Sequence, residues 1–192
     1  MRTKAIMSDH SDNRKAAPSA SERAGQAEAP KGTERSHILL IVANNAPGMV
    51  DRVVGVLRRR RAQPQTISIG QSEIQGVSRI TIQMKDSEVG VEQLIEQLRK
   101  IVDVRHIVNL SSEQAVAREL ALVKVNAAAN SRAEIIEIGN LFGAHIIDLA
   151  QETVTLEVTG SEEKIEKLVT LLQRFGVREI ARTGSVAMTR DM

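Results

Sequence analysis

The sequence contains no cysteine, no tryptophan and no tyrosine, and only two phenylalanines. Without cysteine there is no disulfide, iron–sulfur cluster, thiolate zinc site or cysteine nucleophile, and the composition fits a reducing cytoplasm, where we expect the protein to act. The scarcity of aromatic side chains excludes the stacking platforms on which single-stranded nucleic acids bind.

Long apolar runs and a strong net charge are also missing. No segment has the roughly 18 consecutive apolar residues of a transmembrane helix, and the N-terminus lacks the charged, apolar and small-residue regions of a secretory signal. The net charge is +2, with both signs interspersed, which is no electrostatic footprint for nucleic acid. We therefore expect no membrane and no nucleic acid among the partners.

Recognisable catalytic and metal-binding motifs are absent from the sequence. The four histidines, His10, His37, His106 and His145, form no metal-binding pair. There is no Gly-x-Ser-x-Gly, Walker loop or Gly-x-Gly-x-x-Gly. Most carboxylates lie beside Lys or Arg on expected helix faces. We predict no catalytic residue, no metal site and no cofactor on this chain.

Residues 1–36 contain few large apolar side chains and are rich in Ser, Ala, Gly, Pro and charged residues. Such a segment cannot bury enough surface to offset its ordering entropy, so we predict a flexible extension. A transit peptide is the weaker alternative, because five acidic residues do not fit that class.

From residue 37 the hydrophobic pattern predicts the order β-α-β-β-α-β. Strands are expected at 38–42, 66–71, 78–85 and 102–110. Two apolar stripes at i, i+3, i+4 and i+7 predict helices. The stripes are Val50, Val53, Val54 and Leu57, and Val91, Leu94, Ile95 and Leu98.

The same order repeats in the second half. Strands are expected at 119–127, 144–150, 154–159 and 177–188, and helices follow a capping box at Ser131–Glu134 and a cap at Ser161. The fold class is therefore α+β, with two tandem ferredoxin-like βαββαβ domains at 37–111 and 112–192 and a boundary near Ser111–Ser112. Domains this small are marginal alone, which favours a homodimer.

Arg58–Arg61 is the densest basic run and follows the first predicted helix. It is first interpreted as a solvated helix end that complements the helix dipole. A protein contact is the second interpretation. A nucleic-acid patch comes last, because no aromatic residue interleaves the run.

The segment Asn44-Asn45-Ala46-Pro47-Gly48 joins the first strand to the first helix. If Pro47 is the first helical residue, the amides of Gly48, Met49 and Val50 point outward without a helical acceptor, and can receive a carboxylate. The Asn45 side chain either hydrogen-bonds a ligand or caps the helix. From these residues alone, a plain strand-to-helix turn remains the alternative.

Several segments together resemble one known family. Residues 37–48, followed by Val50, Arg52 and Val53, look like the first strand, turn and helix of an ACT domain. From about residue 37 onward, the chain resembles the small regulatory subunit of acetolactate synthase. The segments that carry this resemblance are 78–83, 93–104, 118–125, 144–148 and 181–185.

The resemblance implies an N-terminal ACT domain and a C-terminal ACT-like domain in a non-catalytic subunit. Such subunits activate a large catalytic subunit that carries thiamine diphosphate, and we expect Mg and FAD there as well. They confer feedback inhibition by a branched-chain amino acid, usually valine, in valine, isoleucine and leucine biosynthesis. The effector lies between the ACT domains of two chains. Carried over to this sequence, the effector-binding residues are Asn45, Gly48, Met49, Val50, Gln63 and Pro64.

One segment departs from the family. After the first helix the family has Arg-Gly-aromatic-Asn-Ile, whereas this chain has Arg60-Arg61-Ala62-Gln63-Pro64. Gln63 keeps an amide on a longer side chain, and Pro64 removes a backbone donor. The departure predicts that valine binding is weakened, lost or redirected to another amino acid. It also leaves open a second hypothesis, a free-standing amino-acid-sensing ACT protein with a different partner.

Overall fold

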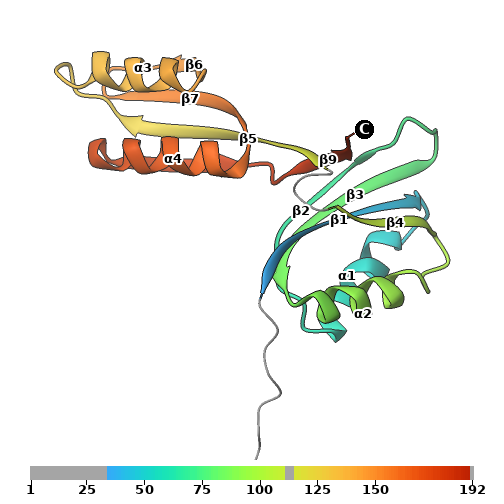
Figure 1. Ribbon diagram of the computed structural model, residues 1–192. Helices are drawn as coiled ribbons and strands as arrows, with labels where there is room; N and C mark the ends of the chain where they lie inside the picture. Colours follow the sequence, from blue (N-terminus) through green and yellow to red (C-terminus); the bar gives the residue numbers. More distant parts are fainter. Residues whose placement is uncertain (1–33, 111–114, 191–192) are drawn as a thin grey trace, which may run out of the picture. The chain divides into compact units, whose positions relative to one another are not determined.

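The computed structural model describes residues 34–110 and 115–190 (Figure 1). The predicted boundary near Ser111–Ser112 and most of the predicted extension lie outside these residues. The first strand begins at Arg35, two residues inside the predicted extension. Arg35 and Ser36 pair with Asp86 and Lys85 of a later strand, and this pairing extends the first strand.

The N-terminal sheet has the predicted βαββαβ order. Its elements are β1 (Arg35–Asn44), α1 (Met49–Arg59), β2 (Pro64–Gln71), β3 (Val77–Asp86), α2 (Glu88–Leu98) and β4 (Val104–Leu110). The four strands are antiparallel in the order β2-β3-β1-β4. The predicted ferredoxin-like topology is confirmed, and β2 and β4 are the edge strands.

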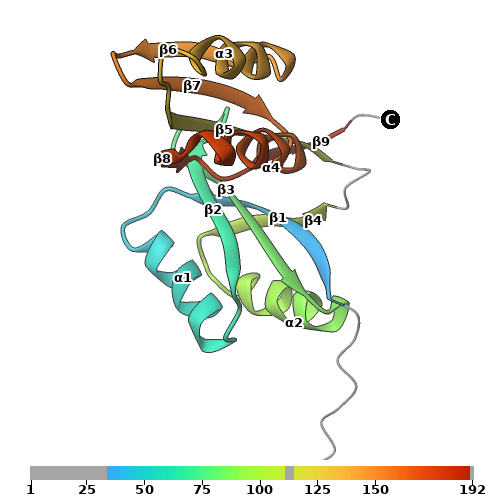
Figure 2. The same cartoon turned by 90° about the vertical axis from the view of Figure 1, so that its left-hand side faces the viewer.

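Alternation along the central strands turns one face of this sheet toward the two helices. Leu39 and Ile41 of β1 and Ile80 and Ile82 of β3 are fully or almost fully buried in one core cluster with apolar residues of α1 and α2. The connection from β1 to β2 carries α1 over the β2 side of the sheet, and α2 lies toward β4 (Figure 2).

The buried stripe of α1 differs from the prediction. Its buried residues are Met49, Val53, Val56 and Leu57. Val50 and Val54, predicted to be buried, are 38% and 44% exposed. The apolar surface of α1 is wider than one stripe, and packing against both the sheet and α2 covers only part of it. Two valines are therefore left on the outer side of α1.

The C-terminal half repeats the same plan. Its elements are β5 (Ala115–Asn126), α3 (Arg132–Leu141), β6 (His145–Leu149), β7 (Thr153–Gly160), α4 (Glu162–Leu172), a 3-10 turn η1 (Gln173–Phe175), β8 (Val177–Arg182) and β9 (Val186–Thr189). The main sheet has the antiparallel order β6-β7-β5-β8, and β9 pairs with the beginning of β5. Ala121, Val123 and Val125 of β5 face the core beneath α3 and α4.

The predicted closing strand 177–188 is wrong in one respect, because it is two strands. Between β8 and β9 the chain turns at Gly184, which has a φ of +74°. A left-handed backbone interrupts an extended strand, and glycine adopts it without a steric penalty.

The predicted helix caps have mixed outcomes. Ser161 caps α4, since its side chain accepts a hydrogen bond from the Lys164 amide. The predicted capping box at Ser131–Glu134 does not form: the Ser131 hydroxyl instead donates to the Ala128 carbonyl at 3.2 Å. Glu134 forms an ion pair with Arg174. The Ser131 backbone is helical rather than extended, which turns its side chain away from the helix amides.

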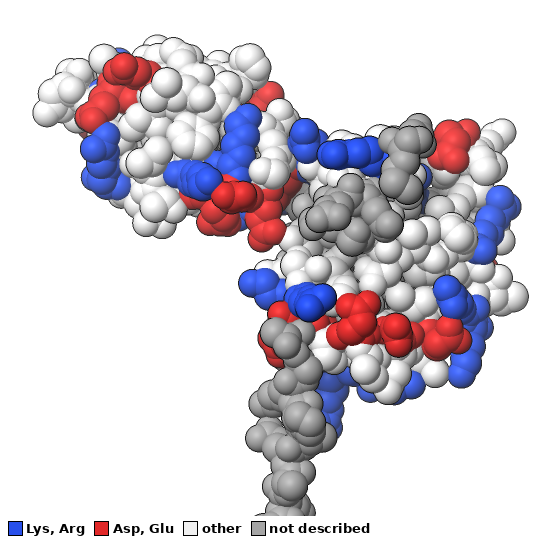
Figure 3. All heavy atoms as spheres, in the orientation of Figure 1, with Lys and Arg blue, Asp and Glu red and all other residues white. Residues whose placement is uncertain are grey.

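Charged side chains of both signs are spread over the surface (Figure 3). Acidic residues form a row along the outer side of α2 at Glu88, Glu92 and Glu96. Within the described residues, no helix is long and apolar enough to cross a membrane.

Candidate functional site

The turn after β1 is held by backbone hydrogen bonds on both sides. The Asn44 amide donates to the Asp103 carbonyl and the Asn45 amide to the Gly76 carbonyl, each at 2.8 Å. The Asn44 side chain accepts from Arg105 Nε at 2.6 Å. Asn45 itself is exposed. The turn is therefore a fixed structure that presents the Asn45 side chain outward.

The helix α1 begins two residues later than the prediction of Pro47 as its first residue requires. Gly48 is the N-cap, with a φ of +74° and a ψ of +8°, and Met49 is the first helical residue. The left-handed backbone at Gly48 reverses the chain direction after Pro47. Pro47 therefore precedes the helix, and the expected position of Pro47 inside the first turn is wrong.

The three amides expected to be open are not equivalent. The Met49 amide donates to the Ala46 carbonyl at 3.1 Å, and the Met49 side chain is buried in the core. Among the described residues, no acceptor is found for the amides of Gly48 and Val50. Two amides at the helix start thus remain open to a ligand carboxylate, while Met49 serves the fold.

Arg52 adds a guanidinium group that the sequence analysis had not assigned to the site, and its charge is paired with Asp103. Its Nε donates to the Asp103 carboxylate at 2.8 Å, and a guanidinium NH2 donates to the Pro47 carbonyl at 3.2 Å. The remaining NH1 lies 3.3 Å from the place where a Cβ on Gly48 would be. The position of Arg52 one turn into the helix was the available signal. Its contact with Asp103, which follows α2 in the sequence, could not be predicted from the sequence.

Gln63 and Pro64 lie at the opposite end of the sheet from this turn. Pro64 pairs with Met84, whereas Asn44 pairs with Val77 at the other end of β3. Seven residues of strand separate the two positions, a distance of about 23 Å. One small ligand cannot contact both within one chain. The structure therefore brings Asn45, Gly48 and Val50 together and leaves Gln63 and Pro64 apart from them.

The segment before β2 has a left-handed backbone at Arg61, a conformation that suits the glycine of the family better than arginine. Arg61 has a φ of +53° and is the single described non-glycine residue with a positive φ. Its amide donates to the Arg58 carbonyl, and the Ala62 amide donates to the Leu57 carbonyl at 3.0 Å, closing the end of α1. Ala62 packs against the core. The Gly and aromatic residue of the family would thus occupy a left-handed position and a half-buried position.

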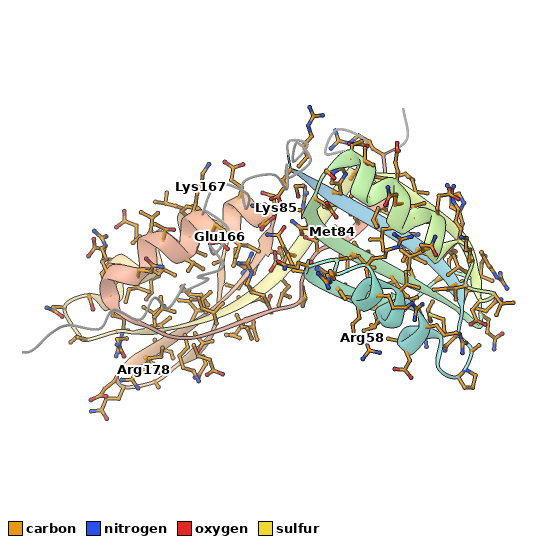
Figure 4. The ribbon with its side chains drawn as sticks, turned by 90° about the horizontal axis from the view of Figure 1, so that it is seen from below. Arg58, Met84, Lys85, Glu166, Lys167 and Arg178 are labelled. Atoms are coloured by element: carbon orange, nitrogen blue, oxygen red, sulfur yellow. The ribbon has the colours of Figure 1, made fainter. Side chains whose placement is uncertain are left out.

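The C-terminal half contains one strongly paired charge cluster. Arg182 of β8 contacts the buried carboxylate of Glu119 through Nε at 2.5 Å and NH2 at 3.0 Å. It also pairs with Glu166 on α4, which is labelled in Figure 4. The hydrogen bond that Arg182 donates to Glu119 raises the pKa of Arg182 further above its usual range. This cluster joins β5, β8 and α4, and we interpret it as structural.

Across 34–110 and 115–190, no group of three or more His, Asp or Glu side chains is arranged to hold a metal ion. His106 lies in β4 and His145 begins β6.

Comparison with known proteins identifies both halves of the chain. Residues 39–106 match the AHAS small subunit-like ACT domain, and residues 118–191 match the family described as the small subunit of acetolactate synthase. An acetolactate synthase small subunit from Mycobacterium bovis is 39% identical over 81% of this chain and 93% of its own length. A probable acetolactate synthase small subunit from Methanothermobacter thermautotrophicus is 40% identical over the same shares.

A solved structure agrees with these relatives. The crystal structure of the acetolactate synthase small subunit from Thermotoga maritima superposes with a TM-score of 0.77, at 35% identity. The match covers 82% of this chain and 99% of that one. On this evidence the chain belongs to the acetolactate synthase small subunit family.

Proposed function

We propose that this chain is the regulatory subunit of acetolactate synthase. It binds the large, thiamine-diphosphate-dependent catalytic subunit, raises its activity and makes it responsive to a branched-chain amino acid. The observation that carries the effector part is the pair of open amides at Gly48 and Val50 beside Arg52. Backbone donors at a helix start, next to a guanidinium, suit the carboxylate of an amino acid.

A homodimer through the ACT domains completes the effector site. β2 is an edge strand, and within the described residues it pairs with β3 alone. The end of β2 at Gln71 lies at the same end of the sheet as the turn, since Gln71 pairs with Ser78 and Asn44 with Val77. If β2 pairs with its own copy in antiparallel fashion about a two-fold axis, the start of one β2 meets the end of the other.

That symmetry brings the two separated halves of the predicted site together. Gln63 and Pro64 of one chain then lie beside the turn of the second chain. The effector carboxylate binds the Gly48 and Val50 amides of one chain, and the amino-acid side chain faces Gln63 and Pro64 of the other. Within one chain, the turn and the Gln63–Pro64 segment are about 23 Å apart. A site shared by two chains requires such a separation.

Exposed apolar residues support the same edge as the interface. Ile67 and Ile69 of β2 pair with Ile82 and Ile80, so they point to the helix face, where they are 37% and 48% exposed. Val50 and Val54 are exposed on α1, which lies over the β2 side of the sheet. An edge strand with exposed isoleucines is a site for pairing with another chain.

The alternative, a free-standing ACT protein with another partner, is weakened by the C-terminal half. The match over residues 118–191 is to the acetolactate synthase small subunit rather than to ACT domains at large. The matches to the Mycobacterium bovis relative and to the Thermotoga structure also extend over both halves of this chain.

Reconstitution tests the proposal. The purified chain alone is expected to show no acetolactate synthase turnover, and mixing it with the large subunit from the same organism is expected to raise that subunit's activity. Calorimetric titration with valine, leucine and isoleucine then identifies the effector. Unchanged activity on mixing, with and without each amino acid, would refute the regulatory role.

Gly48→Asp separates the two parts of the proposal. An aspartate repels the effector carboxylate and fills its space, so amino-acid inhibition is expected to disappear while activation persists. Inhibition that remains at full strength in this variant would remove the turn from the site.

A further inference from the structure

Basic side chains gather where α1 and α2 end. Arg58, Arg59, Arg60 and Arg61 close α1, and Arg99 and Lys100 follow α2. Figure 4 shows Arg58 projecting outward from α1. Arg99 pairs with Glu96 at 2.6 Å. For the other five, no carboxylate partner is found among the described residues.

A small pocket opens between the two helix ends. It has a volume of about 170 Å³ and is lined by Arg59, Arg60, Gln97 and Lys100, with Val56 and Ile101 as its apolar floor. This volume is below the range of about 300–1,000 Å³ of pockets for drug-sized ligands. The pocket therefore suits a compact ligand rather than an extended one.

The cations at the pocket are held in place by a neutral group. With the Gln97 amide oxygen turned toward them, it accepts from Lys100 Nζ and from an Arg60 guanidinium NH2, each at 3.2 Å. The Lys100 amide also donates to the Gln97 carbonyl. An amide orients the cations without cancelling their charge, as a carboxylate would.

The helix dipoles do not account for so many cations. Each helix C-terminus carries about half a negative charge, so two helix ends offset about one cation. Five basic side chains without carboxylate partners leave an excess of about four positive charges. Complementing the helix dipoles therefore accounts for only about one of these charges.

We infer that this pocket binds a compact, multiply charged phosphate anion, such as the diphosphate or triphosphate group of a small molecule. Guanidinium groups bind phosphate oxygens in pairs, and lysine adds a point charge. The chain has no tyrosine or tryptophan, and no aromatic residue lines the pocket, so nothing there stacks a nucleic-acid base. This site is distinct from the effector turn and does not depend on the regulatory function.

Calorimetry with sodium triphosphate tests the site on the full chain at constant ionic strength. The test variant is Arg59→Gln/Arg60→Gln/Lys100→Gln. The control, Arg35→Gln/Lys85→Gln/Arg190→Gln, removes the same charge at exposed positions away from the pocket. Binding is expected to weaken on the order of tenfold or more in the test variant, since three charge-assisted contacts are lost, and by less than twofold in the control. Melting curves are expected to show both variants folded.

The outcomes separate the possible ligands. Equal affinity for sodium triphosphate and a nucleoside triphosphate assigns recognition to the phosphate chain, and tighter binding of the nucleotide adds a nucleoside contact. Tighter binding of hexaglutamate than of triphosphate would overturn the inference in favour of an acidic protein segment. Absence of saturable binding, or equal weakening in both triple variants, would also overturn it.

Discussion

The Arg52 guanidinium joins two segments 51 residues apart, donating to the Asp103 carboxylate through Nε at 2.8 Å. Asp103 is 8% exposed, and its own carbonyl accepts the Asn44 amide at the end of β1. A second guanidinium nitrogen reaches the Pro47 carbonyl. One side chain thus links the candidate effector turn to the loop between α2 and β4.

Arg52→Ala is expected to destabilise the protein by about 2 kcal/mol, because it leaves the Asp103 carboxylate buried without its partner. Urea unfolding measures the loss. Arg58→Ala, on the exposed surface of the same helix, is the matched control and is expected to stay within about 0.5 kcal/mol. A double-mutant cycle with Asp103→Asn isolates the pair, and a coupling energy near zero would contradict it.

Two glycines of the same segment are expected to respond oppositely to alanine. Gly48 has a φ of +74°, and its new Cβ would lie 3.3 Å from Arg52 NH1. Gly48→Ala should destabilise by about 1–2 kcal/mol. Gly55 lies inside α1, where the nearest atom to a new Cβ is the flexible end of Arg59 at 3.4 Å. Gly55→Ala should stabilise by about 0.5–1 kcal/mol. Equal effects in thermal unfolding would refute the assigned cap.

Arg61 adopts a left-handed backbone that costs an L-residue about 1 kcal/mol. Arg61→Gly is therefore expected to raise the free energy of unfolding by about 0.5–1 kcal/mol, partly by relieving repulsion within the basic run. Arg60→Gly is the control, since Arg60 has a φ of −87° and gains nothing from glycine. A stabilisation by Arg60→Gly as large as that by Arg61→Gly would show that charge alone is responsible.

Replacing residues 61–64 by the family's Gly-Phe-Asn-Ile should increase valine sensitivity of the reconstituted enzyme. The variant restores the glycine at the left-handed position, the aromatic residue against the core and the shorter amide at position 63. Calorimetry compares valine binding before and after. Tight valine binding by the unaltered chain would mean that the departure at Gln63 and Pro64 is harmless.

The order of strands and helices was predictable because the apolar spacing alternates between two periods along the chain. Val91, Leu94, Ile95 and Leu98 are all buried, as their spacing predicts. The outward position of Val50 and Val54 was not predictable from α1 alone, since it depends on where α2 and β2 stop covering the helix. Likewise, the separation of Gln63 from the turn follows from the register of β1 and β2 against β3. The hydrophobic pattern of a single sequence does not determine that register.

The last prediction concerns the dimer that we propose forms through the edge strand β2. Ile69→Asp introduces a charge into an exposed apolar edge and is expected to give a monomer at micromolar concentration, with loss of amino-acid inhibition. Ile74→Asp is the matched control, because Ile74 is 49% exposed in the loop between β2 and β3, close to the 48% of Ile69. Sedimentation velocity measures the mass of each variant.

A monomeric unaltered chain would refute the shared effector site, because Gln63 and Pro64 reach the turn only from a second chain. A dimer that survives Ile69→Asp with its inhibition intact would move the interface away from β2.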